Sequence, residues 1–307
     1  MKRSAPEPER SGDSPKGAVA RVVHWLFGPQ PASRLAFLRI FVPLAIVGFL
    51  ASRLVHADLW LSPAGFHVPD LGGDNWRQPL YLPTIPLWAA WSVAALTVLS
   101  GLSLAAGFLT RFSGALFCAL TAYLTLFDRL EAFTVTKLAP VFVLALCISQ
   151  AGKRFSVDAW LARRRDPERK PPSELAGGTV RFFQLFLVTM YSASGIAKAR
   201  GDWLSKAVVW SQLHDDYQTA ISWWMVHTVP GWGFGALQWL TLAFEIGAPL
   251  WFALKWTRKP ALVVGLGMHF MIGILFGPVI WFALLMSALL IACFAPEAWL
   301  AKLLPSG

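Results

Sequence analysis

The feature that most constrains the fold of this chain is a series of eight apolar stretches, each roughly long enough to cross a bilayer as a helix. A membrane-crossing helix needs about 20 mainly apolar residues. The stretches 112–127 and 136–151 are short, so either could be tilted or re-entrant. The sequence therefore predicts an all-α, polytopic membrane bundle of about eight transmembrane helices. The predicted spans are 35–54, 86–109, 112–127, 136–151, 179–199, 234–254, 260–276 and 279–295.

The composition agrees with a membrane protein and argues against a nucleic-acid partner. Hydrophobic residues make up 56% of the 307 positions, charged residues make up 14%, and the mean hydropathy is +0.52. The net charge is +10, which alone could suggest nucleic acid. The Lys and Arg residues lie beside the apolar stretches, however, where they set topology and contact anionic lipid. Membrane lipid is thus an expected partner.

The basic residues are divided unevenly between the two predicted sides of the membrane. One side holds the N-terminal tail, Arg111, the stretch 153–170, the cluster 255–259 and Lys302, and the other side holds far fewer. Basic loops remain in the cytoplasm. We therefore predict a multi-pass protein of the plasma (inner) membrane with cytoplasmic N- and C-termini, which places Lys198 near the outer face.

Three segments lie outside the predicted spans and have different compositions. Residues 1–33, rich in Pro, Ser and charged side chains, are predicted to form a largely disordered basic tail, of which 19–27 could lie on the membrane surface. Residues 203–231 mix tryptophans with acidic residues and histidine, which suits interfacial helices on the outer side. Residues 297–307 form a short C-terminal tail.

The fifth span ends in a polar stripe. Tyr191, Ser194 and Lys198 are three and four residues apart, so they share one helix face. A lysine there can snorkel to the interface, or pair with Asp202 one turn later and anchor the helix end. A lysine held in a partly dry site can instead lose its proton near neutral pH and act as a base. Gly195 would let a neighbouring helix or a ligand approach this face.

Four further ionisable residues lie within or at the edge of spans, where a lipid-facing charge costs several kcal/mol. Lys137 is near a span end and can snorkel, and Arg39 is expected to make a structural pair or cap carbonyls. Glu245 and His269 lie at mid-membrane depth, so both must face the bundle interior, either as a mutual pair or as cavity lining. His269 has no second ligand at helical spacing, so no metal site is expected.

In order and spacing, these residues resemble the horizontally transferred transmembrane (HTTM) family, whose best-known member is the vitamin K-dependent gamma-glutamyl carboxylase. The resemblance covers roughly residues 34–296 as one transmembrane domain. It rests on RLAFLR (34–39), GFLTR (107–111), RFSVDAW (154–160), SGIAK (194–198), DW (202–203), Glu245 and GMH (267–269).

The resemblance implies a carboxylase-like enzyme, a lyase, or a membrane oxidoreductase, in which Lys198 deprotonates a reduced quinone of the vitamin K type at the outer face. Tyr191, Ser194, Gly195 and Trp203 would then contact the quinone, and Glu245 and His269 would relay protons. The chain departs from the carboxylase in having no histidine in the region 133–137, and we expect no counterpart of the carboxylase's large extramembrane domain within residues 1–307. The alternative is a non-catalytic membrane protein that assists maturation or export of a peptide or protein partner, with 153–170 and 203–232 as contact surfaces.

Overall fold

All eight predicted spans are helices in the computed structural model, which describes residues 17–67, 80–128, 133–205, 207–214 and 218–304. The helix boundaries differ from the predicted ones by a few residues, as expected where polar residues end an apolar run. In chain order these helices are α2 (Ala32–Leu54), α4 (Leu87–Ala106), α5 (Thr110–Phe127), α6 (Thr134–Cys147), α8 (Gly178–Arg200), α11 (Gly231–Ala253), α12 (Arg258–Leu275) and α13 (Ile280–Phe294).

The architecture is an all-α polytopic membrane bundle. Five of these helices, α2, α4, α5, α8 and α12, are long and apolar enough to cross a membrane. Two others, α6 and α13, are shorter apolar helices, with 14 and 15 residues. The eighth, α11, has 23 residues but carries Glu245 and Gln238 along one face. The short fourth predicted span is thus a short helix, which begins at Thr134.

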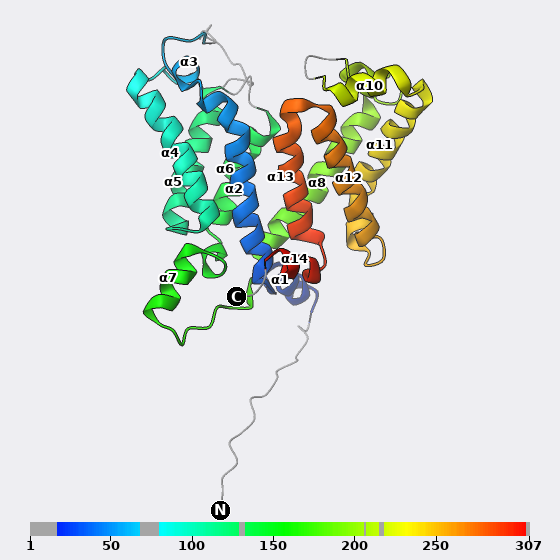
Figure 1. Ribbon diagram of the computed structural model, residues 1–307. Coiled ribbons are helices and arrows are strands. Elements are labelled where there is room, and N and C mark those ends of the chain that lie inside the picture. The colour runs from blue at the N-terminus through cyan, green and yellow to red at the C-terminus, as the bar shows by residue number, and fades with distance from the viewer. Residues whose placement is uncertain (1–16, 68–79, 129–132, 206, 215–217, 305–307) are drawn as a thin grey trace, which may run out of the picture.

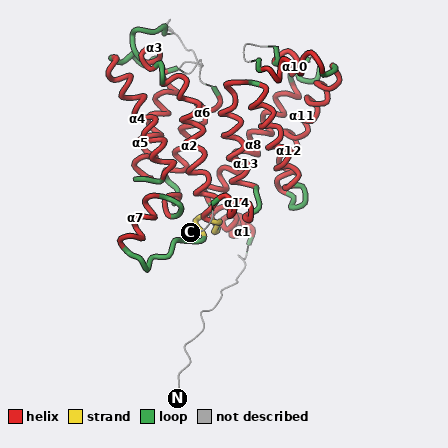
Figure 2. Tube along the Cα trace, viewed as in Figure 1, coloured by secondary structure: helices red, strands yellow, loops and turns green. Residues whose placement is uncertain are grey.

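The centre of the bundle is α2, which packs against α4, α6 and α13. Leu38, Val42, Ile46 and Leu50 recur every four residues along this helix and are fully buried, so they form one continuous core-facing stripe. Figures 1 and 2 show α4 and α5 on one side of α2, and α13, α12 and α11 on the other. The helix α8 packs mainly on α11 and also reaches α13.

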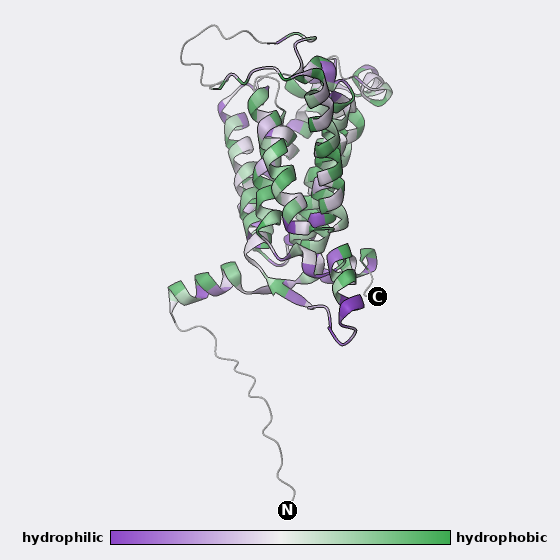
Figure 3. Cartoon of the chain, turned by 90° about the vertical axis from the view of Figure 1, so that its left-hand side faces the viewer, coloured by the Kyte–Doolittle hydropathy of each residue, from purple (hydrophilic) through white to green (hydrophobic). Residues whose placement is uncertain are grey.

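The first and the last described helices lie at the same end of the bundle (Figure 1). The helices α1 (Ala18–Phe27), α7 (Val157–Arg165) and α14 (Glu297–Leu303) gather there (Figure 1). Hydrophilic residues are also concentrated there, and α1 runs crosswise to the bundle helices (Figure 3). The tail was predicted to be largely disordered, but its described part contains α1 and then the strand β1 (Pro29–Pro31). This strand pairs antiparallel with β2 (Glu174–Ala176), so this part of the tail is ordered. Residues 1–16 of that tail lie outside the described residues.

The opposite end carries the short helices α3 (Ala57–Leu61), α9 (Val208–Gln212) and α10 (Ala220–Thr228) (Figure 1). The last two lie within the segment predicted to form interfacial helices. Trp210, Trp223 and Trp224 are exposed on them, as expected for aromatic side chains at a membrane–water boundary. Lys198, near the C-terminal end of α8, belongs to this half of the molecule.

Three arginines near the α1–α14 end satisfy the last carbonyl groups of three helices. Arg34 donates to the carbonyls of Ala292 and Ala295 at the end of α13, at 2.6 and 2.9 Å. Arg258 donates to the Phe252 and Ala253 carbonyls that end α11. Arg39, fully buried, donates to the Leu104 and Ala105 carbonyls at the end of α4 and to the Phe155 carbonyl. The last carbonyls of a helix have no amide partner in a following turn, and a cation there also opposes the helix dipole.

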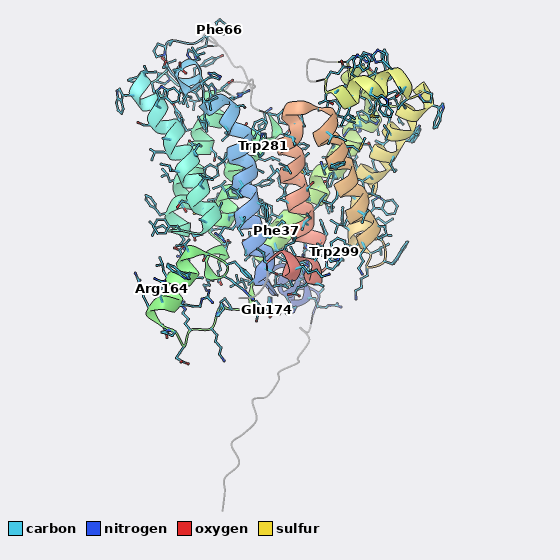
Figure 4. The ribbon with its side chains drawn as sticks, in the orientation of Figure 1. Phe37, Phe66, Arg164, Glu174, Trp281 and Trp299 are labelled. Carbon is cyan, nitrogen blue, oxygen red and sulfur yellow. The ribbon has the colours of Figure 1, made fainter. Side chains whose placement is uncertain are left out.

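The arrangement gives a direct test of orientation, using positions at opposite ends of the bundle (Figure 4). Phe66, 92% exposed, lies at the α3 end, and Arg164, on α7, lies at the other. In a background with the native cysteines replaced, we expect Phe66→Cys to react with a membrane-impermeant maleimide in intact cells. Arg164→Cys should react only after the cells are permeabilised. Labelling of Arg164→Cys in intact cells would reverse the predicted topology.

Candidate functional site

A polar cluster within the bundle joins α8 to α11. The Nζ atom of Lys198 donates to both carboxylate oxygens of Glu245, at 2.6 and 2.7 Å, and to the hydroxyl oxygen of Ser194 at 2.8 Å. The Glu245 side chain is 8% exposed and that of Lys198 is 23% exposed. The cation and the carboxylate therefore neutralise each other inside the bundle, while the lysine remains accessible from one side.

Gly195 allows the two helices to approach closely enough for this ion pair. A Cβ atom on Gly195 would lie 2.8 Å from the backbone nitrogen of Ile246 and 3.0 Å from the Cβ atom of Glu245. Both distances are shorter than ordinary van der Waals contact, so only glycine fits at this crossing of α8 and α11. Small residues have the same role at many helix crossings in membranes.

The indole ring of Trp203 covers the lysine and is fixed by α11. Its ring centroid lies 5.1 Å from Nζ of Lys198, a cation–π distance. Its Nε1 atom donates to the carbonyl of Gln238 at 3.0 Å, and the buried Gln238 amide donates in return to the Trp203 carbonyl. The side-chain oxygen of Gln238 also accepts from the backbone of Val209 at the start of α9. Gln238 thus holds the chain that follows α8 against the lysine site.

A second polar pair joins α8 to α12. The hydroxyl of Tyr191 lies 2.7 Å from Nε2 of His269, and both side chains are buried. The ring of Phe244 packs edge-on against Tyr191 at 5.2 Å, and that of Phe282 packs edge-on against His269 at 5.8 Å. The other ring nitrogen of His269, Nδ1, has no hydrogen-bond partner in the described part of the chain. This pair lies two helical turns from Lys198, about 10 Å along α8.

The structure places the polar residues that the sequence pattern assigned to the site in two clusters along α8. Within the described part of the chain, Glu245 and His269 do not form a mutual pair, which was one of the two predicted alternatives. Glu245 and His269 are both buried, as predicted for mid-membrane charges. In the described contacts they are not bonded to each other, because each pairs with a residue of α8 instead. Two other predicted charges lie elsewhere: Lys137 is exposed in the first turn of α6, and Arg39 caps α4.

Lys198 was predicted near the membrane boundary, whereas its ammonium group contacts a carboxylate predicted at mid-depth. Helix side chains lean toward the helix N-terminus, so a lysine near the end of α8 points back into the bundle. The bond from Nζ to Ser194, one turn earlier, reflects this direction. The aliphatic part of the Lys198 side chain spans the distance from the helix end to Glu245. The position of the residue in the sequence alone therefore underestimated how deep in the bundle the ammonium group lies.

Sequence reasoning missed Gln238, and its spacing could have revealed it. Gln238 lies seven residues before Glu245, which is two helical turns on the same face of an apolar helix. A buried amide at that spacing from a buried carboxylate indicates a continuous polar face. Among the described residues, no group of three or more His, Cys, Asp or Glu side chains lies together in an arrangement that could hold a metal ion.

Fold and site together define a polytopic integral membrane protein with a polar cluster inside its helix bundle. The chain matches the HTTM domain over residues 27–299 and belongs to that family, which is associated with vitamin K-dependent carboxylase-like membrane proteins. No curated protein and no solved structure shows significant similarity to the chain.

The close helix crossing predicts that Gly195→Ala destabilises the protein. The added methyl would push α11 away from α8 and lengthen the Lys198–Glu245 contact, at a cost of about 1–3 kcal/mol in unfolding free energy. Gly267→Ala on α12 is the matched control, because a Cβ there meets no atom within 4 Å. Unfolding of the detergent-solubilised variants measures both. Equal stability of the two variants would contradict the proposed role of Gly195.

The loss of unfolding free energy should differ between two tyrosines whose hydroxyl groups are both buried, Tyr191 and Tyr123. Tyr191→Phe leaves His269 without its hydrogen bond and should lower the free energy of unfolding by about 1–3 kcal/mol. Tyr123→Phe should change it little, because the buried Tyr123 hydroxyl has no partner among the described residues. The same unfolding measurement compares them, and a larger loss for Tyr123→Phe would refute this interpretation.

Proposed function

We propose that the protein is a membrane enzyme in which Lys198 takes a proton from a hydroxyl group of a reduced quinone. The observation that carries the proposal is the bond between Nζ of Lys198 and both oxygens of Glu245, with the lysine still partly accessible. A quinone in its reduced form supplies a weakly acidic hydroxyl and reducing electrons for a second substrate, as the family's association with vitamin K chemistry suggests. The electrons of the quinol pass to an oxidant such as dissolved oxygen, and in the carboxylase-like case the group that is modified belongs to a peptide or protein.

The Lys198–Glu245 pair allows the lysine to act as a base inside the bundle. The ammonium of Lys198 and the carboxylate of Glu245 together carry no net charge. Transfer of a proton from the ammonium to the carboxylate would leave a neutral amine with a free electron pair. Nζ could then accept the proton of the quinol hydroxyl, which leaves an ammonium beside a carboxylic acid and a negative charge on the donor oxygen. Attraction between the new ammonium and that oxygen is strong in a medium of low dielectric constant and offsets part of the cost of separating the charges.

The neighbouring residues position this base. Ser194 accepts a hydrogen bond from Nζ and fixes the lysine rotamer, while Trp203 supplies an aromatic face beside it. Gln238 holds Trp203 in place from α11. Tyr191 and His269 lie deeper on the same side of α8, and the buried Nδ1 of His269 has no hydrogen-bond partner among the described residues.

On the surface that faces away from the bundle, α11 and α12 provide a binding place for an apolar molecule from the bilayer. A groove of about 290 Å³ runs between these helices and is lined by Leu240, Phe244, Trp251, Trp256 and Val264, among others. Phe244 belongs both to this groove and to the packing around Tyr191. The residues present therefore fit an aromatic ring with an apolar tail: the groove suits the tail, and the amine, carboxylate, hydroxyl and indole groups suit a hydroxylated ring.

The proposal predicts that Lys198→Arg abolishes turnover but preserves folding. A guanidinium keeps the positive charge beside Glu245 but does not give up its proton near neutral pH. With chemically reduced menaquinone supplied to the purified protein and dissolved oxygen as the electron acceptor, we expect quinol consumption above the protein-free background to fall about 100-fold or more, as is typical on loss of a general base. Binding of the quinol, followed by fluorescence quenching of the tryptophans, should persist.

Lys137→Arg is the matched control, because it makes the same chemical change at an exposed lysine and should leave turnover unchanged. Wild-type turnover in Lys198→Arg would make Lys198 a structural anchor. If the wild-type protein neither co-purifies with a quinone nor consumes quinol, the catalytic proposal fails. The exposed tryptophans of α9 and α10 then favour the non-catalytic alternative, a membrane protein that assists a peptide or protein partner.

A further inference from the structure

A basic pocket lies at the α1–α14 end of the molecule, far along the bundle from Lys198. The helix α7 forms one wall, and the chain that follows it folds back to form the other. The pocket has a volume of about 190 Å³, roughly six times the ~30 Å³ that a water molecule occupies in the liquid. It can therefore hold a phosphate group with part of its ester, but not a whole lipid.

The charge of the pocket lining is strongly positive. Lys153, Arg163, Arg169 and Lys170 line it together with a single acidic residue, Asp158. The Asp158 carboxylate is already engaged, because it accepts hydrogen bonds from the backbone nitrogens of residues 109 and 110 and from the Thr110 hydroxyl, at 2.7–2.9 Å. The four cations are exposed, and none of them forms an ion pair within the described residues. The pocket thus favours an anion.

Specific contacts hold the two walls in place. Ser156 caps the N-terminus of α7 by accepting from the backbone of Ala159, and Asp158 ties the first turn of α7 to the start of α5. On the other wall, Arg154 donates to the carbonyl of Pro172 at 3.3 Å. Beyond Pro172 the chain enters β2, which is paired with β1. The basic side chains therefore project from a fixed backbone.

Apolar surface begins directly beside the pocket. Phe108, Leu109 and Phe112 are exposed at the turn between α4 and α5, the turn that Asp158 binds. On α7 itself, Trp160 is exposed, and the guanidinium of Arg164 lies 4.0 Å from its ring centroid. Figure 4 shows Arg164 at this end of the molecule, beyond the end of the bundle helices. A ligand with an anionic head and apolar chains matches a basic pocket next to an apolar corner.

We propose that this pocket binds the phosphate-bearing headgroup of an anionic phospholipid, whose acyl chains lie along the exposed side chains at the start of α5. Arginine and lysine recognise phosphate by charge and by hydrogen bonding. Free phosphate shares the headgroup chemistry but gains nothing from the apolar corner. The lipid therefore fixes α7 and the start of α5 at the membrane surface, independently of the chemistry at Lys198.

The test compares two charge-matched triple variants of the full chain. The pocket variant carries Arg163→Gln, Arg169→Gln and Lys170→Gln. The control carries Arg165→Gln, Lys255→Gln and Lys259→Gln, which removes three exposed positive charges outside the pocket lining. Native mass spectrometry of the detergent-solubilised proteins follows titration with phosphatidylglycerol, phosphatidylcholine or inorganic phosphate, and thermal unfolding confirms that both variants are folded.

Wild type should bind phosphatidylglycerol in preference to phosphatidylcholine, and the pocket variant should bind phosphatidylglycerol about 100-fold more weakly, given the contribution of each basic group near an anionic lipid. The control variant should stay close to wild type. Equal losses in the two variants would show general charge attraction and overturn the proposal. Equal binding of phosphatidylcholine, or displacement of the lipid by an equal concentration of inorganic phosphate, would also overturn it.

Discussion

The structure depends on one constraint: every charge inside a membrane-spanning bundle must have a partner within the protein. The bilayer core provides no water, so an unpaired charge or carbonyl there costs several kcal/mol. Arg34, Arg39 and Arg258 meet this constraint together with the helix ends that they cap, because each arginine donates to carbonyls at the end of a helix. The three arginines thus stabilise the ends of α13, α4 and α11.

The same constraint makes α8 the helix that organises the other half of the bundle. Its polar face has one partner on α11, through Lys198 and Glu245, and one on α12, through Tyr191 and His269. Because Gly195 lies between these two contacts, the backbones of α8 and α11 approach most closely where the polar face needs its partners. The aromatic rings of Phe244 and Phe282 then enclose the deeper pair.

The sequence predicted the helices well because the length of an apolar run is a local property. Predicted span 35–54 corresponds to Ala32–Leu54, and 234–254 corresponds to Gly231–Ala253. The pairing of β1 with β2, by contrast, joins segments more than 140 residues apart, and nothing local specifies it. The sequence also did not predict which residues Lys198 and His269 contact. Periodicity shows which residues share a face of one helix, but the neighbouring helix is chosen by the packing of the whole bundle.

The energetics of the Lys198–Glu245 pair support a role beyond stability. Removing two charges from water costs several kcal/mol, and a well-packed apolar pair of similar volume is often equally stable or more so. Packing alone therefore does not explain why this ion pair lies in the bundle. The buried charge of Arg39, by contrast, is explained by its hydrogen bonds to the carbonyls at the end of α4. The lysine is also more exposed than the carboxylate, so the pair is accessible from the side of the amine. The proposed role of Lys198 as a base accounts for this access, because a base must meet its substrate.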